Sequence, residues 1–263
     1  MTLIMAIVNV TPDSFSDGGR YLDPDAAIAH ARSLRAQGAD LLDIGGESTR
    51  PGAERVAPRV EQQRVLPVVE ALASEGAVVS IDTMNASTAR AAVAAGARIV
   101  NDVSGGLADP DMLDAVAETE AEIALGHWRG PSADMYARAD YVDVGREVAD
   151  ELAERVAAAR AAGIAPGRIV VDPGIGFGKR GIQNWDVLRA IPTIAALGSR
   201  VLIGTSRKRF LAEVLGDDAD LARRDLATAV TSALAARSGA WAVRVHDVPT
   251  TRDALAVARA WEA

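Results

Sequence analysis

The chain has 263 residues, a length that suits one α/β barrel or two small domains. It contains no cysteine, which excludes disulfides and thiolate metal sites and favours a reducing compartment. Lys and Arg number 28 against 36 Asp and Glu, and the net charge of −8 argues against a general nucleic-acid or anionic-membrane surface. No apolar run reaches the roughly 18 residues of a membrane span and no basic leader precedes the first strand, so we expect a soluble, cytoplasmic protein.

Eight short apolar runs alternate with longer helical patterns along the chain. Each run has the continuous apolar character of a parallel strand that is covered on both faces. Glycines such as Gly38 and Gly163 precede the next strand, where glycine tolerates the left-handed conformation that closes a helix. The predicted strands are Leu3–Val10, Asp40–Gly46, Ala77–Thr83, Arg98–Ser104, Ala121–His127, Arg168–Gly174, Arg200–Ser206 and Ala240–Val248.

Eight strand–helix units predict a single (β/α)8 barrel over residues 1–263, because no linker or change of composition divides the chain. The alternative is an open, doubly wound sheet. In the nucleotide-binding form of that fold, a Gly-rich phosphate loop follows the first strand, and the segment from Asn9 to Asp13 contains no such loop. The barrel is therefore favoured.

Polar side chains follow nearly every predicted strand. All strands of such a barrel are parallel, so these ends meet on one rim, where barrel enzymes carry their active sites. A single Asp or Asn at a strand end is often only the cap of the next helix, but caps need no Arg, Lys or His. The residues at these ends are Asn9, Asp43, Glu47, Asp82, Thr83, Asn101, Asp102, His127, Asp172, Ser206, Arg207, Lys208, Arg244, His246 and Asp247.

Two kinds of chemistry are expected on this rim. Asp82, Asn101 and Asp172 offer acceptors that suit a flat ligand rich in N–H groups, since paired carboxylate oxygens match an amidine-like edge. The positive groups, which follow strands two, seven and eight, predict a phosphate or diphosphate pocket, with salt bridges to the rim carboxylates as the alternative. Asn9 is a hard oxygen ligand that could hold Mg²⁺ against a diphosphate. The positive groups are Arg50, Lys208, Arg244 and His246.

Seven segments, taken in chain order, share the motifs of one known family and together span the chain. They are Asn9–Gly19, Gly46–Ala53, Ser80–Thr83, Asn101–Gly106, Asp172–Lys179, Ser206–Lys208 and Arg244–Val248. In these segments the chain resembles the dihydropteroate synthases, which belong to the pterin-binding barrels. One segment alone would be a weak signal, whereas seven in the family's order are specific.

The family reaction joins 7,8-dihydropterin-6-ylmethyl diphosphate to p-aminobenzoate and releases diphosphate. The resemblance implies a homodimer with Mg²⁺ bound at Asn9. It implies that Asp82, Asn101 and Asp172 bind the pterin, with Asp172 at the 2-amino/N3 edge and Lys208 on the carbonyl side. The diphosphate would contact Thr49, Arg50, Arg244 and His246, and p-aminobenzoate would contact Phe15, Asp17, Arg50, Pro51, Phe177 and Lys208.

The family mechanism is dissociative: diphosphate leaves first, and the amine then attacks a cationic pterin methylene. Arg244, His246 and Mg²⁺ would stabilise the leaving group, while rim carboxylates such as Asp82 would stabilise the cation. Lys208 completes the implied catalytic set. No enzyme nucleophile is needed.

Three positions depart from the family pattern. Gly126 stands where members usually have Met, which predicts a looser wall of the pterin pocket. Arg209 stands where many have Ser, and we expect it to alter contact with the carboxylate of p-aminobenzoate. Gln183 replaces a frequent His.

Two other functions fit the same barrel. A methyltetrahydrofolate corrinoid methyltransferase would use the pterin pocket without a diphosphate, and the Ser48–Gly52 and Arg244–His246 segments argue against it. A non-catalytic pterin-binding paralogue is favoured only by Gly126, and the diphosphate set argues against it.

Overall fold

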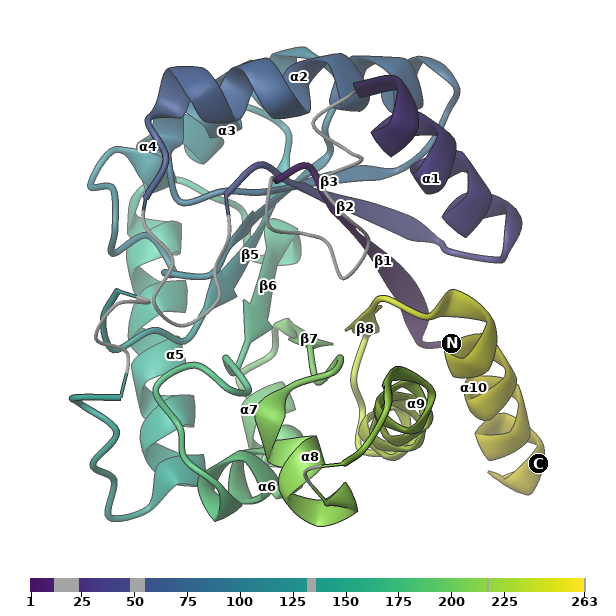
Figure 1. Ribbon diagram of the computed structural model, residues 1–263. Coiled ribbons are helices and arrows are strands. Elements are labelled where there is room, and N and C mark those ends of the chain that lie inside the picture. Colours follow the sequence, from purple (N-terminus) through teal and green to yellow (C-terminus); the bar gives the residue numbers. More distant parts are fainter. Residues whose placement is uncertain (12–23, 48–54, 132–135, 217, 263) are drawn as a thin grey trace.

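Eight parallel strands close into a barrel in sequence order, from β1 beside β2 to β8 beside β1 (Figure 1). The computed structural model describes residues 1–11, 24–47, 55–131, 136–216 and 218–262. Its strands are β1 Leu3–Asn9, β2 Leu41–Gly45, β3 Val79–Asp82, β4 Ile99–Asp102, β5 Glu122–Gly126, β6 Ile169–Asp172, β7 Arg200–Ile203 and β8 Ala242–Val245. The predicted (β/α)8 fold is confirmed.

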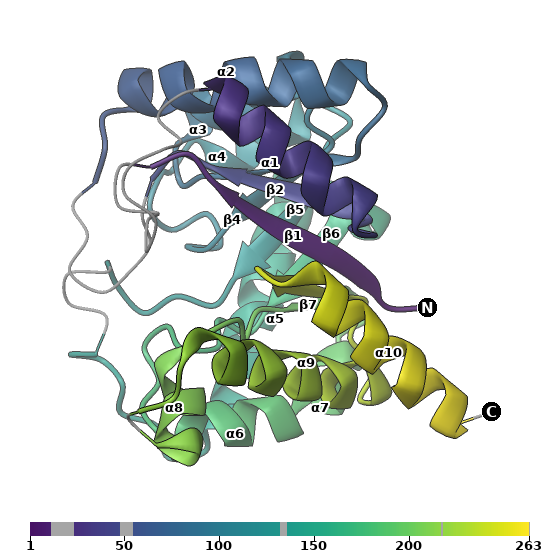
Figure 2. The same ribbon diagram turned by 45° about the vertical axis from the view of Figure 1, so that its right-hand side comes forward.

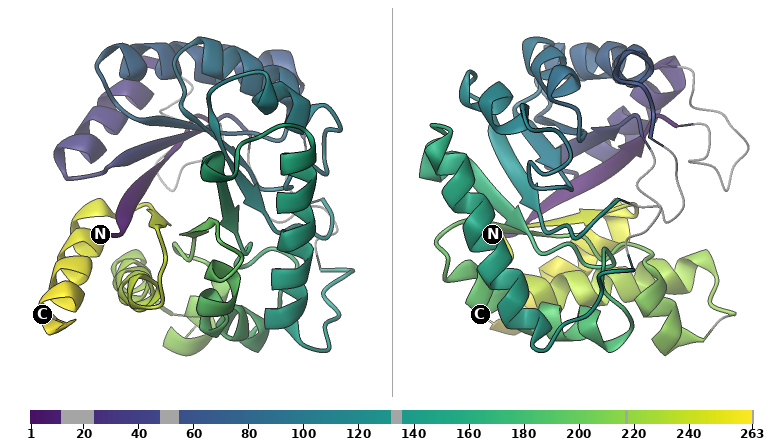
Figure 3. Two further views of the ribbon diagram at one scale, coloured as in Figure 1. Left: turned by 180° about the vertical axis from the view of Figure 1, so that it is seen from behind. Right: turned by 90° about the vertical axis from the view of Figure 1, so that its left-hand side faces the viewer.

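Helices surround the barrel on the outside (Figures 2 and 3). Two helices stand between β6 and β7, and two more between β7 and β8. None of the helices in the described ranges combines the length and apolarity that crossing a membrane requires. The helices are α1 Pro24–Ala36, α2 Pro58–Ser74, α3 Ala86–Ala94, α4 Met112–Ala117, α5 Val144–Ala161, α6 Ile182–Arg189, α7 Ile191–Ala195, α8 Arg209–Leu215, α9 Leu221–Arg237 and α10 Val248–Glu262.

The last predicted strand extends too far. It is expected to end at Val248, but β8 ends at Val245 and Val248 begins α10. The reason is Asp247, whose carboxylate accepts hydrogen bonds from the backbone N–H (3.3 Å) and hydroxyl (2.5 Å) of Thr250. Such a carboxylate satisfies a donor that the first turn of a helix would otherwise leave unpaired.

Apolar side chains fill the half of the barrel interior nearer the N-terminal ends of the strands, and polar side chains line the half nearer the C-terminal ends. Met5, Leu41, Ile99, Val170 and Leu202 belong to one buried cluster contributed by five different strands. Successive side chains of a strand point to opposite faces, so the residues two positions later also point into the barrel. Those residues include Ile7, Asp43, Asn101 and Asp172, one layer nearer the rim. This alternation directs the predicted site residues inward.

Candidate active site

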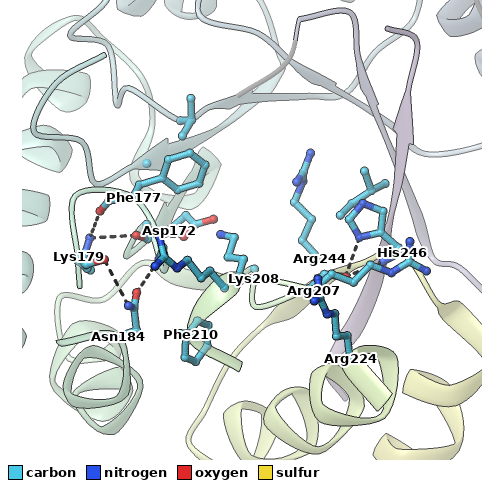
Figure 4. A pocket seen from close by; sticks show the side chains of 18 of the residues that line it. Asp172, Phe177, Lys179, Asn184, Arg207, Lys208, Phe210, Arg224, Arg244 and His246 are labelled. Atoms are coloured by element: carbon cyan, nitrogen blue, oxygen red, sulfur yellow. Dashed lines mark hydrogen bonds between the residues drawn. The ribbon is translucent and has the colours of Figure 1, made fainter. Parts of the chain in front are cut away.

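The C-terminal rim of the barrel opens into a cavity of about 1070 Å³. Every predicted site residue within the described ranges lines it, and Figure 4 shows several of them converging. Thr49, Arg50, Phe15, Asp17 and Pro51 were also predicted here, and they lie outside the described residues. The predicted residues that line the cavity are Asn9, Asp82, Asn101, Asp172, Phe177, Lys208, Arg244 and His246.

Strand register explains why residues so distant in sequence meet. Asn9 pairs with Gly45, Gly45 with Asp82, and Asp82 with Asn101, so one row runs across β1 to β4. On the opposite side, Asp172 pairs with Gly126 of β5. Parallel strands therefore bring these acceptor groups to the same C-terminal end of the barrel.

Arg244 forms ion pairs with two rim carboxylates. Its Nε donates to Asp43 Oδ2 and its Nη2 to Asp82 Oδ2, each at 2.6 Å. The alternative considered above, salt bridges between the positive groups and the rim carboxylates, is therefore correct for Arg244. Burial raises the pKa of Asp82 to about 7, although Arg244 acts in the opposite direction. The guanidinium is fixed in the cavity before any ligand arrives.

Asp43 belongs to this cluster, although no role was assigned to it from the sequence. It is fully buried, and Oδ2 accepts hydrogen bonds from Arg244 and from Asn101 Nδ2 (3.1 Å). Its Oδ1 atom has no hydrogen-bond partner among the described residues. Its position at the end of β2 was the available signal, but side chains of β4 and β8 had to be placed before its partners were visible.

Asp172 and Lys208 form the opposite side of the site, where Lys208 points toward Asp172 in Figure 4. Asp172 Oδ1 accepts a hydrogen bond from the backbone N–H of Gly174 at 2.8 Å. Burial raises the pKa of Asp172 and lowers that of Lys208 to about 8, and their mutual attraction opposes both shifts. The ammonium of Lys208 donates to the carbonyl of Ile175 and lies 4.6 Å from the centre of the Phe177 ring.

His246 is oriented by Ser206. The backbone N–H of His246 donates to Ser206 Oγ at 3.1 Å, and the same Oγ lies 2.8 Å from His246 Nδ1. Oγ has a hydrogen of its own that it can donate to Nδ1. In the neutral tautomer in which Nδ1 accepts this hydrogen, the ring proton lies on Nε2, and that atom is then a donor suited to a phosphate oxygen.

Several other polar strand ends are structural. Asp102 points away from the cavity and accepts hydrogen bonds from Ser104 N (2.8 Å) and Gly106 N (2.7 Å). Glu47 accepts from Val56 N at 2.9 Å and pairs with Arg55. These two carboxylates therefore support the local backbone, as the capping alternative predicts, and do not line the cavity.

Gly126 does not loosen the wall of the pterin pocket, contrary to the prediction. A Cβ atom at this position would lie 2.3 Å from the carbonyl oxygen of Val103 and 2.6 Å from its Cα. The backbone that follows β4 therefore occupies the space of the missing side chain. Arg209, at the start of α8, is exposed and lines the cavity, whereas Gln183 bonds to Arg180 N and Ala139 O.

Asn9 fits the limited part that a protein plays in binding Mg²⁺ beside a diphosphate. Asn9 lines the cavity, and its amide oxygen lies beside Gly45, 3.7 Å from where a Cβ of that residue would be. Among the described residues, no group of three His, Cys, Asp or Glu could hold a metal ion. Mg²⁺ commonly takes one or two protein oxygens and completes its shell with phosphate and water, and this donor set suits that kind of binding.

The fold and cavity together define a barrel enzyme that binds a small ligand at its C-terminal rim. The model of the family described as "Pterin binding enzyme" matches residues 5–246. A dihydropteroate synthase of Mycobacterium leprae is 53% identical over 263 residues, covering 98% of this chain and 93% of that protein. The chain belongs to the pterin-binding enzymes and, within them, to the dihydropteroate synthase family.

Solved structures agree with this assignment. The dihydropteroate synthase of Xanthomonas albilineans with 4-aminobenzoic acid has a TM-score of 0.92 and 46% identity, covering 100% of this chain and 93% of that one. The complex of the same enzyme with 7,8-dihydropteroate has a TM-score of 0.88 and 43% identity, covering 100% and 94%.

Proposed function

We propose that this chain joins 7,8-dihydropterin-6-ylmethyl diphosphate to p-aminobenzoate, giving 7,8-dihydropteroate and diphosphate in folate biosynthesis. The observation that carries the proposal is one cavity that holds the acceptor set and the cationic set together, in a chain of this family. The related structures that contain 4-aminobenzoic acid and 7,8-dihydropteroate support the same substrates.

Pterin recognition is assigned to the buried acceptors. Asp172 Oδ1 is engaged by Gly174 N, and its carboxylate is available to accept from the 2-amino/N3 edge of the pterin. Asn101 and Asp82 would meet other polar atoms of the ring, and Lys208 the carbonyl side. Because these groups are held by strands and by each other, little side-chain freedom is lost when the ligand binds.

Departure of the diphosphate is assigned to the positive side. The bond between the methylene carbon and the diphosphate oxygen breaks with its electrons passing to the leaving group. Arg244 and His246 would stabilise that growing negative charge, while Asp82 and its neighbours stabilise the positive pterin methylene. The amine of p-aminobenzoate then forms the new C–N bond and loses a proton.

We assign Mg²⁺ to Asn9 as the one protein oxygen contributed by the described residues. When bound with the diphosphate, the ion would supply a positive charge against which the leaving group separates. Arg244 and His246 bind and orient the same group through hydrogen bonds.

A turnover assay tests the proposed function. Purified protein given both substrates and Mg²⁺ should release diphosphate and form 7,8-dihydropteroate in equal amounts. Binding of a pterin without turnover would support the non-catalytic paralogue. Methyl transfer from methyltetrahydrofolate to a corrinoid protein would instead support the methyltransferase.

We further propose a single-domain, cytoplasmic protein that acts as a homodimer. The support for a dimer is an exposed apolar stripe on neighbouring helices α9 and α10. Sedimentation should give twice the mass of one chain, and the measured mass should fall toward that of one chain in Leu234→Glu. The stripe consists of Leu226, Val230 and Leu234 on α9 with Val257 and Trp261 on α10.

A further inference from the structure

Lys179 is a buried ammonium to which the proposed reaction gives no role. It and Lys208 are the two lysines of the chain, and all other members of the Lys and Arg total are arginines. Lys179 directly follows the loop Gly174–Gly178, which comes after β6; it lines the cavity and has an exposed fraction of only 1%. Burying a charged side chain costs free energy unless it is fully hydrogen-bonded, so its partners indicate what it does.

All three N–H donors of the ammonium are used. Nζ donates to the carbonyls of Gly174 and Phe177, each at 3.0 Å, and lies 2.9 Å from His127 Nδ1 (Figure 4 shows the carbonyl contacts). An ammonium has three donors and no acceptor, so the charged form is satisfied by this set. One side chain thus ties both ends of the loop to the end of β5.

The contact with Lys179 also determines the tautomer of His127. If Nδ1 accepts from the ammonium, the ring proton lies on Nε2, which is 2.9 Å from Glu151 Oε2 on α5. Burial first, and the charge of Lys179 second, lower the pKa of His127 to about 4, so the ring is neutral near pH 7. Glu151 is held in turn by Arg129 Nε at 3.0 Å.

The loop that Lys179 ties down carries groups of the proposed site. Gly174 N donates to Asp172 Oδ1, and the carbonyl of Ile175 accepts from Lys208. Gly174, Gly176 and Gly178 all have positive φ, a conformation that side chains would strain, and glycine leaves such a segment intrinsically flexible. A glycine-rich loop that must hold Asp172 in register needs fixing from outside its own backbone.

We propose that Lys179, oriented by His127 and Glu151, is a positioning residue that holds the 174–178 loop so that Asp172 and Phe177 meet the two substrates. This inference rests on the proposed function and deepens it. A displacement of about 1 Å in a substrate-orienting group can cost roughly a hundredfold in rate, so fixing this loop affects both binding and turnover.

The charged groups around Lys179 come from several elements. They are Asp172 on β6, Lys208 after β7, Glu151 on α5 and Arg129 after β5. Burial lowers the pKa of Lys179 to about 7, with attraction by Asp172 as the largest opposing influence. The hydrogen bond from Nζ to His127 Nδ1 needs the protonated amine. Lys179 loses that proton more readily here than a lysine in water does, because its pKa is lowered.

Variants at Lys179 and His127 separate this role from general packing. Lys179→Met, which keeps an unbranched side chain of nearly the same length, should weaken calorimetric pterin affinity about tenfold and raise KM for p-aminobenzoate more than it lowers kcat. His127→Leu should match it. His127→Gln, whose amide retains one acceptor and donors, should stay within about threefold of wild type. Because the residues act together, Lys179→Met/His127→Leu should be no worse than either single change.

The matched control is Tyr141→Phe. The Tyr141 hydroxyl donates to Gly178 O at 3.0 Å, so this variant removes a hydrogen bond to the same loop from its outer side without removing a charge. It should change pterin affinity by less than about threefold. Circular dichroism checks the folding of each variant, and if Lys179→Met does not fold, His127→Leu and His127→Gln carry the comparison.

A fluorine spectrum gives a readout that is independent of turnover. The chain has three phenylalanines, so 4-fluorophenylalanine labelling gives few signals, and Phe177→Leu identifies that of Phe177. This signal should move or broaden in Lys179→Met and His127→Leu but not in Tyr141→Phe. An unchanged signal together with pterin affinity within twofold of wild type would overturn the proposal, even in a fully active enzyme. Loss of turnover alone would concern the proposed function instead.

Discussion

Asp43 and Arg244 show how one buried pair organises the site at the scale of single residues. Asp43 has one carboxylate oxygen engaged and the other without a partner among the described residues. Buried polar atoms are nearly always hydrogen-bonded in native proteins, so this unpaired oxygen is an exception within the site. Asp43 does not itself line the cavity, and it acts there by holding Arg244 and Asn101, which do.

Asp172→Asn should nearly abolish pterin binding and leave the fold intact. The amide oxygen would stay with Gly174 N, so the NH₂ group would face the N–H edge of the pterin. Loss of a charge-assisted pair and an opposed donor should cost about 2–4 kcal/mol. Calorimetry with a pterin measures this, and a loss of less than about fivefold would contradict the assigned contact.

Arg244→Ala should lower kcat/KM by about a hundredfold or more, because charge on the diphosphate develops in the transition state. It should also destabilise the protein by about 3 kcal/mol, since Asp43 and Asp82 lose their buried counter-charge. Arg244→Lys should rescue part of the rate, because a point charge lacks the planar fork. Diphosphate release at the wild-type rate in the alanine variant would show that the leaving group is not bound here.

At the scale of elements, alternation along each strand assigns one set of side chains to the helices and the other to the barrel interior. At the end of β8, Val245 belongs to the core cluster under the helices, while Arg244 and the following His246 line the cavity. In β4, Asn101 lines the cavity while Asp102 supports the following turn. Two neighbouring polar residues thus have different roles because successive side chains of a strand point to opposite faces.

Gly126→Ala should destabilise the protein by about 2 kcal/mol or more. The new Cβ would meet the backbone of Val103, which cannot move aside as a flexible side chain would. Gly167→Ala is the matched control, because it has ordinary φ and no atom within 4 Å of its Cβ position. Thermal unfolding compares the two, and equal melting temperatures would show that β4 and β5 separate easily.

At the scale of the whole molecule, burial of ionisable groups in the barrel links stability to pH. Burial lowers the pKa of Lys179 to about 7 and that of Lys208 to about 8, below the ordinary value of 10.5 for a lysine in the unfolded chain. Between these values the unfolded chain binds more protons than the folded protein. The free energy of unfolding should therefore rise as pH rises above about 8.

Urea unfolding between pH 8 and 9.5 measures this dependence. The rise should be smaller in Lys208→Met, which removes one of the two groups. A free energy of unfolding that stays constant over this range would mean that the lysines keep their ordinary pKa values. Arg207→Gln is a control, because its ion pair with Asp225 contains no lysine.

The sequence by itself determined the barrel and the membership of its site. Eight apolar runs with polar ends are local patterns, and parallel closure brings those ends together whatever the details of packing. It follows that the cavity-lining residues Asn9, Asp82, Asn101, Asp172, Lys208, Arg244 and His246 could be named from these patterns, whereas Phe177 was named by the resemblance to the dihydropteroate synthases.

Only the tertiary structure decided which of these groups are partners. Arg244 and Asp43 are 201 positions apart, and no pattern in the sequence states that their side chains meet. The same holds for Lys179 with His127, and for the backbone of Val103 against Gly126. Such pairings depend on strand register and on the direction of each side chain, which are fixed only when the barrel closes.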